Sequence, residues 1–96
     1  MILAEDLGFD HNDEEILHVG TPQPGQALQM IIEDGNRVSL RKGNIEIEVQ
    51  DLKKTGNDIY CGKVKYVEPY QALSEDGVGE DVEICFSYKH IFACQH

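Results

Sequence analysis

Residues 45–50 read Ile45-Glu46-Ile47-Glu48-Val49-Gln50, an unbroken alternation of apolar and polar side chains. Successive side chains of a β-strand point to opposite faces of the sheet, so this alternation is typical of a half-buried strand. It directs the three apolar side chains towards a core and the two glutamates away from it. The stretch therefore predicts an all-β protein and sets the register of its central strand.

Shorter stretches on both sides of this strand carry the same signal. Strands are expected over residues 37–41, 59–67, 82–88 and 90–95, and a further one over residues 27–33 leads into an Asp34-Gly35 turn. Short turns force neighbouring strands to be antiparallel, and a short meander has exposed edges unless it curls. We therefore expect a small antiparallel barrel of five or six strands, SH3-like or PilZ-like, over residues 27–96.

The strand predicted over residues 59–67 contains Gly62. A glycine inside a strand indicates a bulge or a close approach of another backbone. Strict alternation divides the other side chains between two faces, with Tyr60, Gly62, Val64 and Tyr66 on one and Cys61, Lys63 and Lys65 on the other.

The N-terminal part of the chain has no clear period. Asn12 and the three acidic residues after it are typical of a helix start, but Gly20 and Pro22 limit that helix to barely two turns. The stretch Pro22-Gln23-Pro24-Gly25 is typical of a linker. We expect residues 1–26 to form an acidic, loosely ordered arm.

Charge is unevenly distributed along the 96 residues, whose formal net charge is −10. Residues 1–34 contain eight acidic residues and neither Lys nor Arg, whereas residues 35–96 contain ten acidic and eight basic residues. Such a surface repels nucleic-acid phosphates and anionic membranes, and it allows a protein partner with a basic surface. The chain has no basic N-terminal region and no apolar run of about 20 residues, so we expect a cytoplasmic protein.

The three cysteines, Cys61, Cys85 and Cys94, are odd in number and include no Cys-x-x-Cys pair, which favours reduced thiols. A zinc site would have to use Cys85, His90, Cys94 and His96, with Cys61 as a further ligand. The spacing of these residues matches no standard zinc motif, so no metal and no cofactor are expected. His90 and Cys94 would lie about 13 Å apart along one strand, too far for a nucleophile and its base. We therefore expect no enzyme.

Two stretches carry a family resemblance. Arg37-Val38-Ser39-Leu40-Arg41 has the spacing Arg-x-x-x-Arg, and Asp51-Leu52-Lys53-Lys54-Thr55-Gly56 is similar to Asp-x-Ser-x-x-Gly with lysine in place of serine. In this order they resemble the PilZ family, small β-barrels that bind cyclic di-GMP. The resemblance implies that the two arginines grip phosphates and guanine edges. The alternative is a solvated basic strand face that lies opposite the glutamates of residues 45–50.

The sequence favours a non-catalytic binding or adaptor domain that contacts a protein partner. Its contact surface is expected to combine basic side chains with tyrosines, because Arg and Tyr are enriched at binding hot spots. The residues concerned are Arg37, Arg41, Lys63, Lys65, Tyr66, Tyr70 and Tyr88. A sensor barrel for a small anionic nucleotide is the alternative, and a structural zinc module is the third hypothesis.

Overall fold

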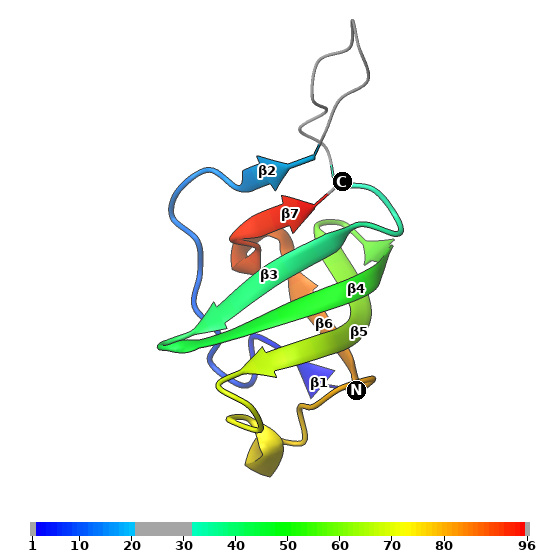
Figure 1. Ribbon diagram of the computed structural model, residues 1–96. Coiled ribbons are helices and arrows are strands. Elements are labelled where there is room, and N and C mark those ends of the chain that lie inside the picture. The colour runs from blue at the N-terminus through cyan, green and yellow to red at the C-terminus, as the bar shows by residue number, and fades with distance from the viewer. Residues whose placement is uncertain (1, 21–31, 96) are drawn as a thin grey trace, which may run out of the picture.

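The computed structural model describes residues 2–20 and 32–95, and these residues form one β-sheet with two short 3-10 helices (Figure 1). Its elements are β1 (Ile2–Leu3), β2 (Leu17–Val19), β3 (Arg37–Lys42), β4 (Ile45–Gly56), β5 (Ile59–Glu68), η1 (Ser74–Asp76), β6 (Glu83–Ser87), η2 (Tyr88–His90) and β7 (Ala93–Gln95). The all-β class is confirmed. No helix among the described residues is long and apolar enough to cross a lipid bilayer.

The sheet is open and mixed, with the strand order β1-β6-β5-β4-β3-β7-β2. The strands β3 to β6 pair successively in antiparallel fashion, and β7 is antiparallel to β3. By contrast, β1 and β2 pair in parallel with β6 and β7. The predicted antiparallel barrel of five or six strands is therefore wrong, and its SH3-like or PilZ-like form gains no support. The sheet is mixed and not purely antiparallel because the N-terminal segment supplies both edge strands, β1 and β2, and each of them pairs in parallel.

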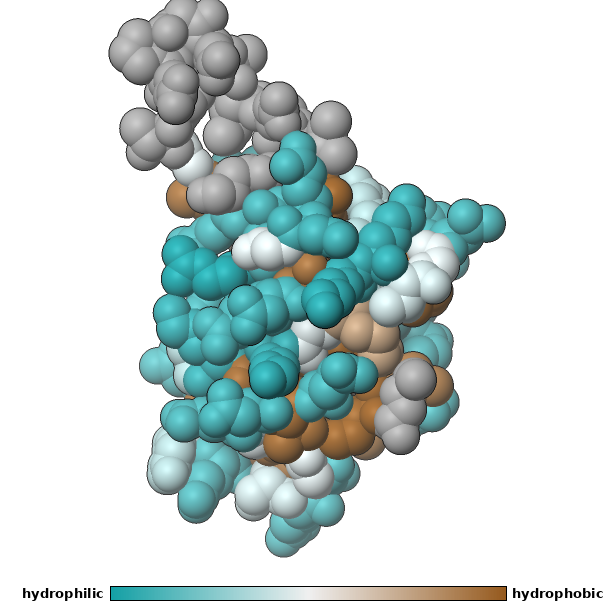
Figure 2. Space-filling view, turned by 90° about the vertical axis from the view of Figure 1, so that its right-hand side faces the viewer, coloured by the Kyte–Doolittle hydropathy of each residue, from teal (hydrophilic) through white to brown (hydrophobic). Residues whose placement is uncertain are grey.

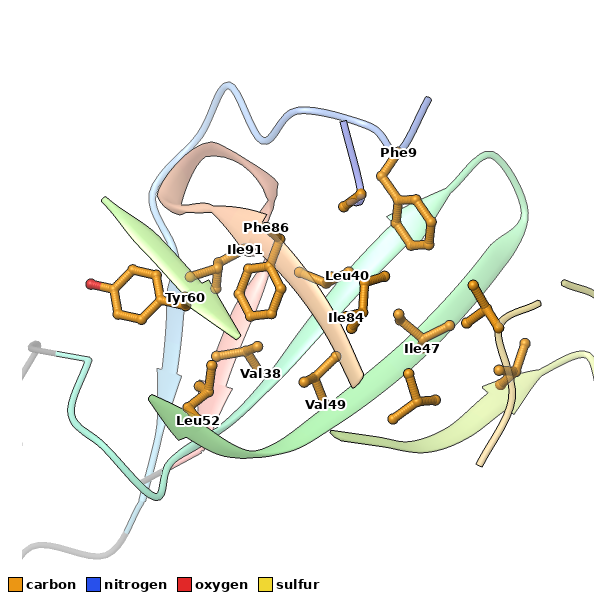
Figure 3. Close-up of a cluster of buried hydrophobic side chains, with 14 of the residues drawn as sticks. Phe9, Val38, Leu40, Ile47, Val49, Leu52, Tyr60, Ile84, Phe86 and Ile91 are labelled. Atoms are coloured by element: carbon orange, nitrogen blue, oxygen red, sulfur yellow. The ribbon is translucent and has the colours of Figure 1, made fainter. Parts of the chain in front are cut away.

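The core lies between the two halves of the curled sheet, where side chains of β3 and β4 face those of β5 and β6 (Figure 3). Ile47 and Val49 are fully buried, which confirms the register predicted for residues 45–50. Glu48 points to the other face but is only 9% exposed, because neighbouring side chains cover it. The alternating stretch therefore fixes the inner and outer faces of the sheet.

The approach of β5 to β4 explains Gly62. A Cβ atom at this position would lie 2.6 Å from the carbonyl oxygen of Gln50 and 2.7 Å from Cγ1 of Val49. The predicted close approach is confirmed. The pairing of β4 with β5 also shifts in register. Val64 pairs with Val49, but Tyr66, two residues further along β5, pairs with Glu48, which is only one residue away from Val49. This bulge turns Tyr66 outward, so the expected strict alternation through residue 66 is wrong.

Residues 2–20 pack against the sheet, unlike the loosely held arm expected from their composition. Ala4, Phe9 and Ile16 belong to the buried core, and backbone hydrogen bonds join this segment to β3 and to the chain around η2. No helix follows Asn12; its side chain accepts a hydrogen bond from the Glu14 amide, and β2 forms instead. The predicted linker, the boundary at residue 26 and most of the strand predicted over 27–33 lie outside the described residues.

Candidate functional site

The predicted basic surface lies on the outer face of β3 to β5, where acidic side chains alternate with the basic ones. Arg41 is directly opposite Glu46, and its guanidinium lies 4.9 Å from the centre of the Phe92 ring. The Lys65 ammonium is 3.7 Å from a carboxylate oxygen of Glu48. Because the positive charges are balanced by neighbouring carboxylates, this face is mixed in charge rather than basic.

The remaining residues of the predicted surface are dispersed. Arg37 pairs with Gln95 near one end of β3, and Lys63 lies between Gln50 and Glu83. Tyr66 is on the same outer face, with 38% of its surface exposed. The other two tyrosines lie apart from this face, Tyr70 in the segment between β5 and η1 and Tyr88 at the start of η2. The stretches that resemble the PilZ family, residues 37–41 and 51–56, both lie in strands.

The sequence favoured reduced thiols at all three cysteines, and this prediction is wrong. Cys61 and Cys85 form a disulfide, with their Cα atoms 4.1 Å apart. The reason is register, because antiparallel pairing of β5 and β6 sets the two residues directly opposite each other. Cys94 is a buried free thiol next to the Asn36 side chain, and burial raises its pKa to about 11. Cys85, Cys94 and His90 therefore do not form the conjectured zinc site, and His96 lies outside the described residues.

A groove of about 410 Å³ lies between β1, the start of β5, the end of β6 and η2. We call it the apolar groove; its apolar lining comprises Leu3, Ile59, Cys85 and Phe86. Leu3 and Ile59 are each 38% exposed, so each presents part of its apolar surface to the groove. Figure 2 shows that hydrophobic residues gather low on one face of the molecule, at the height of β1 in Figure 1, with hydrophilic residues around them.

Charged and titratable side chains form the polar part of this groove. One carboxylate oxygen of Glu5 lies 2.9 Å from Nε2 of His11 and 2.9 Å from Nε2 of His90. The hydrogen bond from His11 lowers the pKa of Glu5. Burial lowers the pKa of His90, whose side chain is 1% exposed. At neutral pH the cluster therefore consists of an ionised carboxylate beside a neutral, buried imidazole.

The hydrogen bonds of His90 decide what this cluster can do. The Ser87 backbone N–H donates to Nδ1 over 3.0 Å, so the proton of the neutral ring is on Nε2 and faces Glu5. This buried Nε2 is close to the carboxylate but makes no aligned hydrogen bond. A metal-binding imidazole instead needs a lone pair on one nitrogen and usually donates from the other. The cluster therefore suits attachment of the N-terminal segment to η2 better than metal binding.

Sequence reasoning missed Glu5 and His11 as members of a site. They lie six residues apart in an acidic segment without period, and only the fold brings them to His90. No signal in the sequence could have found this contact. No family model, no curated protein and no solved structure matches the chain.

Proposed function

We propose that the protein is a non-catalytic binding domain that holds a basic and apolar segment of a protein partner in the apolar groove. The observation that carries this proposal is the exposure of Leu3 and Ile59 on the lining of one groove. Apolar side chains at the centre of a contact with a polar rim are typical of protein interfaces. A partner side chain placed between them would remove their apolar surface from water, which is the main favourable contribution to association.

Charge favours a basic partner segment. The carboxylates of Glu5 and Asp58 line the groove, against the single ammonium group of Lys89. The Glu5 side chain is 67% exposed and so is open to a lysine or arginine of a partner. The N-terminal segment, which contributes Leu3, Glu5 and His11 to the groove, carries five further acidic residues, Asp6, Asp10, Asp13, Glu14 and Glu15. Complementary potentials of this kind speed encounter and orient the partner.

The absence of catalysis is part of the proposal, and the thiol chemistry supports it. Nucleophilic catalysis needs an activated group within reach of a base. Among residues 2–20 and 32–95, Cys94 is the one free thiol, and its burial and raised pKa keep it protonated and inaccessible. Nothing in the described part of the chain favours the nucleotide-sensor hypothesis or a structural zinc site built on Cys85, His90 and Cys94, and the cytoplasmic location stays a prediction.

Selection from a random peptide library on the immobilised protein tests this proposal. We expect the selected peptides to carry Lys or Arg next to Leu, Ile or Phe, and their affinity to fall as salt is raised. Full burial of a Leu or Ile side chain contributes about 1.5–3 kcal/mol. Leu3 and Ile59 are each 38% exposed, so a partner can gain about 0.6–1.1 kcal/mol from each, and Leu3→Ser and Ile59→Ser should each weaken binding about three- to sevenfold.

The matched control is Tyr70→Ser, because Tyr70 is 78% exposed and does not line the apolar groove. This variant should bind selected peptides as tightly as the wild-type protein. A selection without enrichment would refute the proposal, and so would peptides whose affinity is unaffected by both groove variants.

A further inference from the structure

We propose that Cys61, Cys85 and Glu83 bind a thiophilic divalent cation such as Zn²⁺ once their disulfide is reduced. This site shares Cys85 with the lining of the apolar groove, but it is tested by metal binding and does not depend on the proposed peptide contact. The two Sγ atoms and one carboxylate oxygen of Glu83 lie within 4.8 Å of one another. Two thiolates and a carboxylate, with water in the fourth position, are a ligand set that Zn²⁺ accepts in tetrahedral coordination.

The strand register places these ligands side by side. Glu83 and Cys85 are two residues apart on β6, so their side chains share a face. Cys61 is directly opposite Cys85 on β5. Ligand atoms around one tetrahedral zinc are separated by about 3.3–3.8 Å, as the bond lengths of about 2.0–2.3 Å require. Shifts of about 1–2 Å in the three donor atoms give this spacing once the disulfide is reduced.

The redox state changes the charge of the site. Lys53 lies opposite Cys61 on β4, and Lys63 lies opposite Glu83. Asp34 and Asp51 line the same groove as Glu83 and the two lysines, so in the disulfide form three carboxylates stand against two ammonium groups. Reduction and deprotonation add two thiolates, which raises the number of negative groups to five and favours a cation.

Solvent reaches the site from the side of Cys61 and Glu83, whereas Cys85 is buried. Cys61, Glu83, Lys53 and Lys63 line a second groove of about 700 Å³ on the outer side of the sheet. In the reaction, two molecules of a small thiol reduce the disulfide and are themselves joined in a disulfide. The two new cysteine thiols then release two protons to the buffer as their sulfurs bind the ion.

Competition with a chromophoric chelator tests the site in the full chain, using Zn²⁺ as the probe and a phosphine as the reductant. We expect the reduced protein to bind one zinc ion with release of two protons, and the oxidised protein to bind none. With Co²⁺ in place of Zn²⁺, the reduced protein should show the absorption of thiolate-to-metal charge transfer.

Variants identify the ligands. Cys61→Ser should abolish the charge-transfer band, and Glu83→Gln should weaken zinc binding at least about tenfold through loss of an anionic ligand. Glu80→Gln is the matched control, because Glu80 is exposed and lies outside the ligand cluster, and Cys94→Ser controls for the remaining thiol; both should bind like the wild type. The proposal is overturned if reduced protein binds no zinc, if it loses its folded spectrum even with zinc, or if Cys61→Ser or Glu83→Gln binds unchanged.

Discussion

Alanine in place of Gly62 should destabilise the protein, because β5 passes too close to β4 at this position to admit a side chain. The added Cβ would lie 2.6 Å from the Gln50 carbonyl oxygen and 2.7 Å from a methyl group of Val49. The oxygen belongs to a paired strand and Val49 is fully buried, so neither can move without disturbing the sheet. Overpacking costs about 1–3 kcal/mol, and the stiffer unfolded chain returns about 0.4–1 kcal/mol. The expected net loss is about 1–2 kcal/mol.

Urea unfolding followed by circular dichroism measures this loss. With a slope of about 1–2 kcal/mol per molar urea, the midpoint should fall by about 1 M. Gly79→Ala is the matched control, since a Cβ atom at Gly79 would meet nothing within 4 Å. Its midpoint should stay the same or rise slightly. A midpoint for Gly62→Ala at or above that of the wild type would refute the close approach and the pairing of β4 with β5 on which it depends.

Three further predictions concern the thiols, the buried histidine and the strand register. Unfolding in urea without reductant should expose one thiol, that of Cys94, to a chromogenic thiol reagent, and that thiol should react slowly in the folded protein; three reactive thiols would show that the disulfide does not form. Burial holds the pKa of His90 below its ordinary value of 6.5, so the unfolded chain takes up a proton that the folded chain does not as the pH falls through 6.5. The thermal midpoint should therefore fall between about pH 7.5 and pH 5.5, and His90→Gln should flatten this dependence; an unchanged slope would contradict the reasoning. In denaturant titration Ile47→Ala should cost about 2–5 kcal/mol and Glu46→Ala less than about 0.5 kcal/mol, whereas the opposite order would mean that the strand faces are inverted.

The sequence predicted those parts of the fold in which the alternation of apolar and polar side chains matches the alternation of buried and exposed positions. Ile47 and Val49 are buried because one face of β4 covers the core, and alternation expresses that fact directly. The outward turn of Tyr66 could not be predicted, because a bulge adds one residue without changing composition. Gly62 did indicate irregular pairing, and the close approach of another backbone at this glycine was predicted.

The role of the N-terminal segment escaped prediction for a different reason. Its two strands are only two and three residues long, too short to show a period, and each pairs with a strand from the last part of the chain. Its core residues, Ala4, Phe9 and Ile16, are irregularly spaced because turns separate them. The prediction relied on the acidic composition of the segment, which reflects its solvent-exposed side, and gave too little weight to these few apolar residues.

The candidate sites depend on contacts between distant residues. The disulfide requires the register of β5 against β6, which no local pattern of residues 61–85 reveals, and an odd cysteine count favoured free thiols. The contact of Glu5 with His90 joins opposite ends of the chain. Of the predicted contact residues, the arginines of β3 and the lysines of β5 share a face because strand alternation puts them there, and Tyr66 joins them through the bulge. Tyr70 and Tyr88 lie in irregular segments.

Because both edge strands come from the first part of the chain, the order of synthesis matters for folding. On the ribosome, residues 2–19 emerge well before the strands with which they pair, which lie between residues 83 and 95. At about 5–20 residues per second, the nascent N-terminal segment waits about 4–16 seconds for its partners. Until then Phe9 and Ile16 have no complete core to enter, and the growing meander has strand edges open to other chains. A chain whose synthesis stops before β7 would keep an unpaired edge of this kind, and it would be a substrate for chaperones or proteases rather than a smaller folded protein.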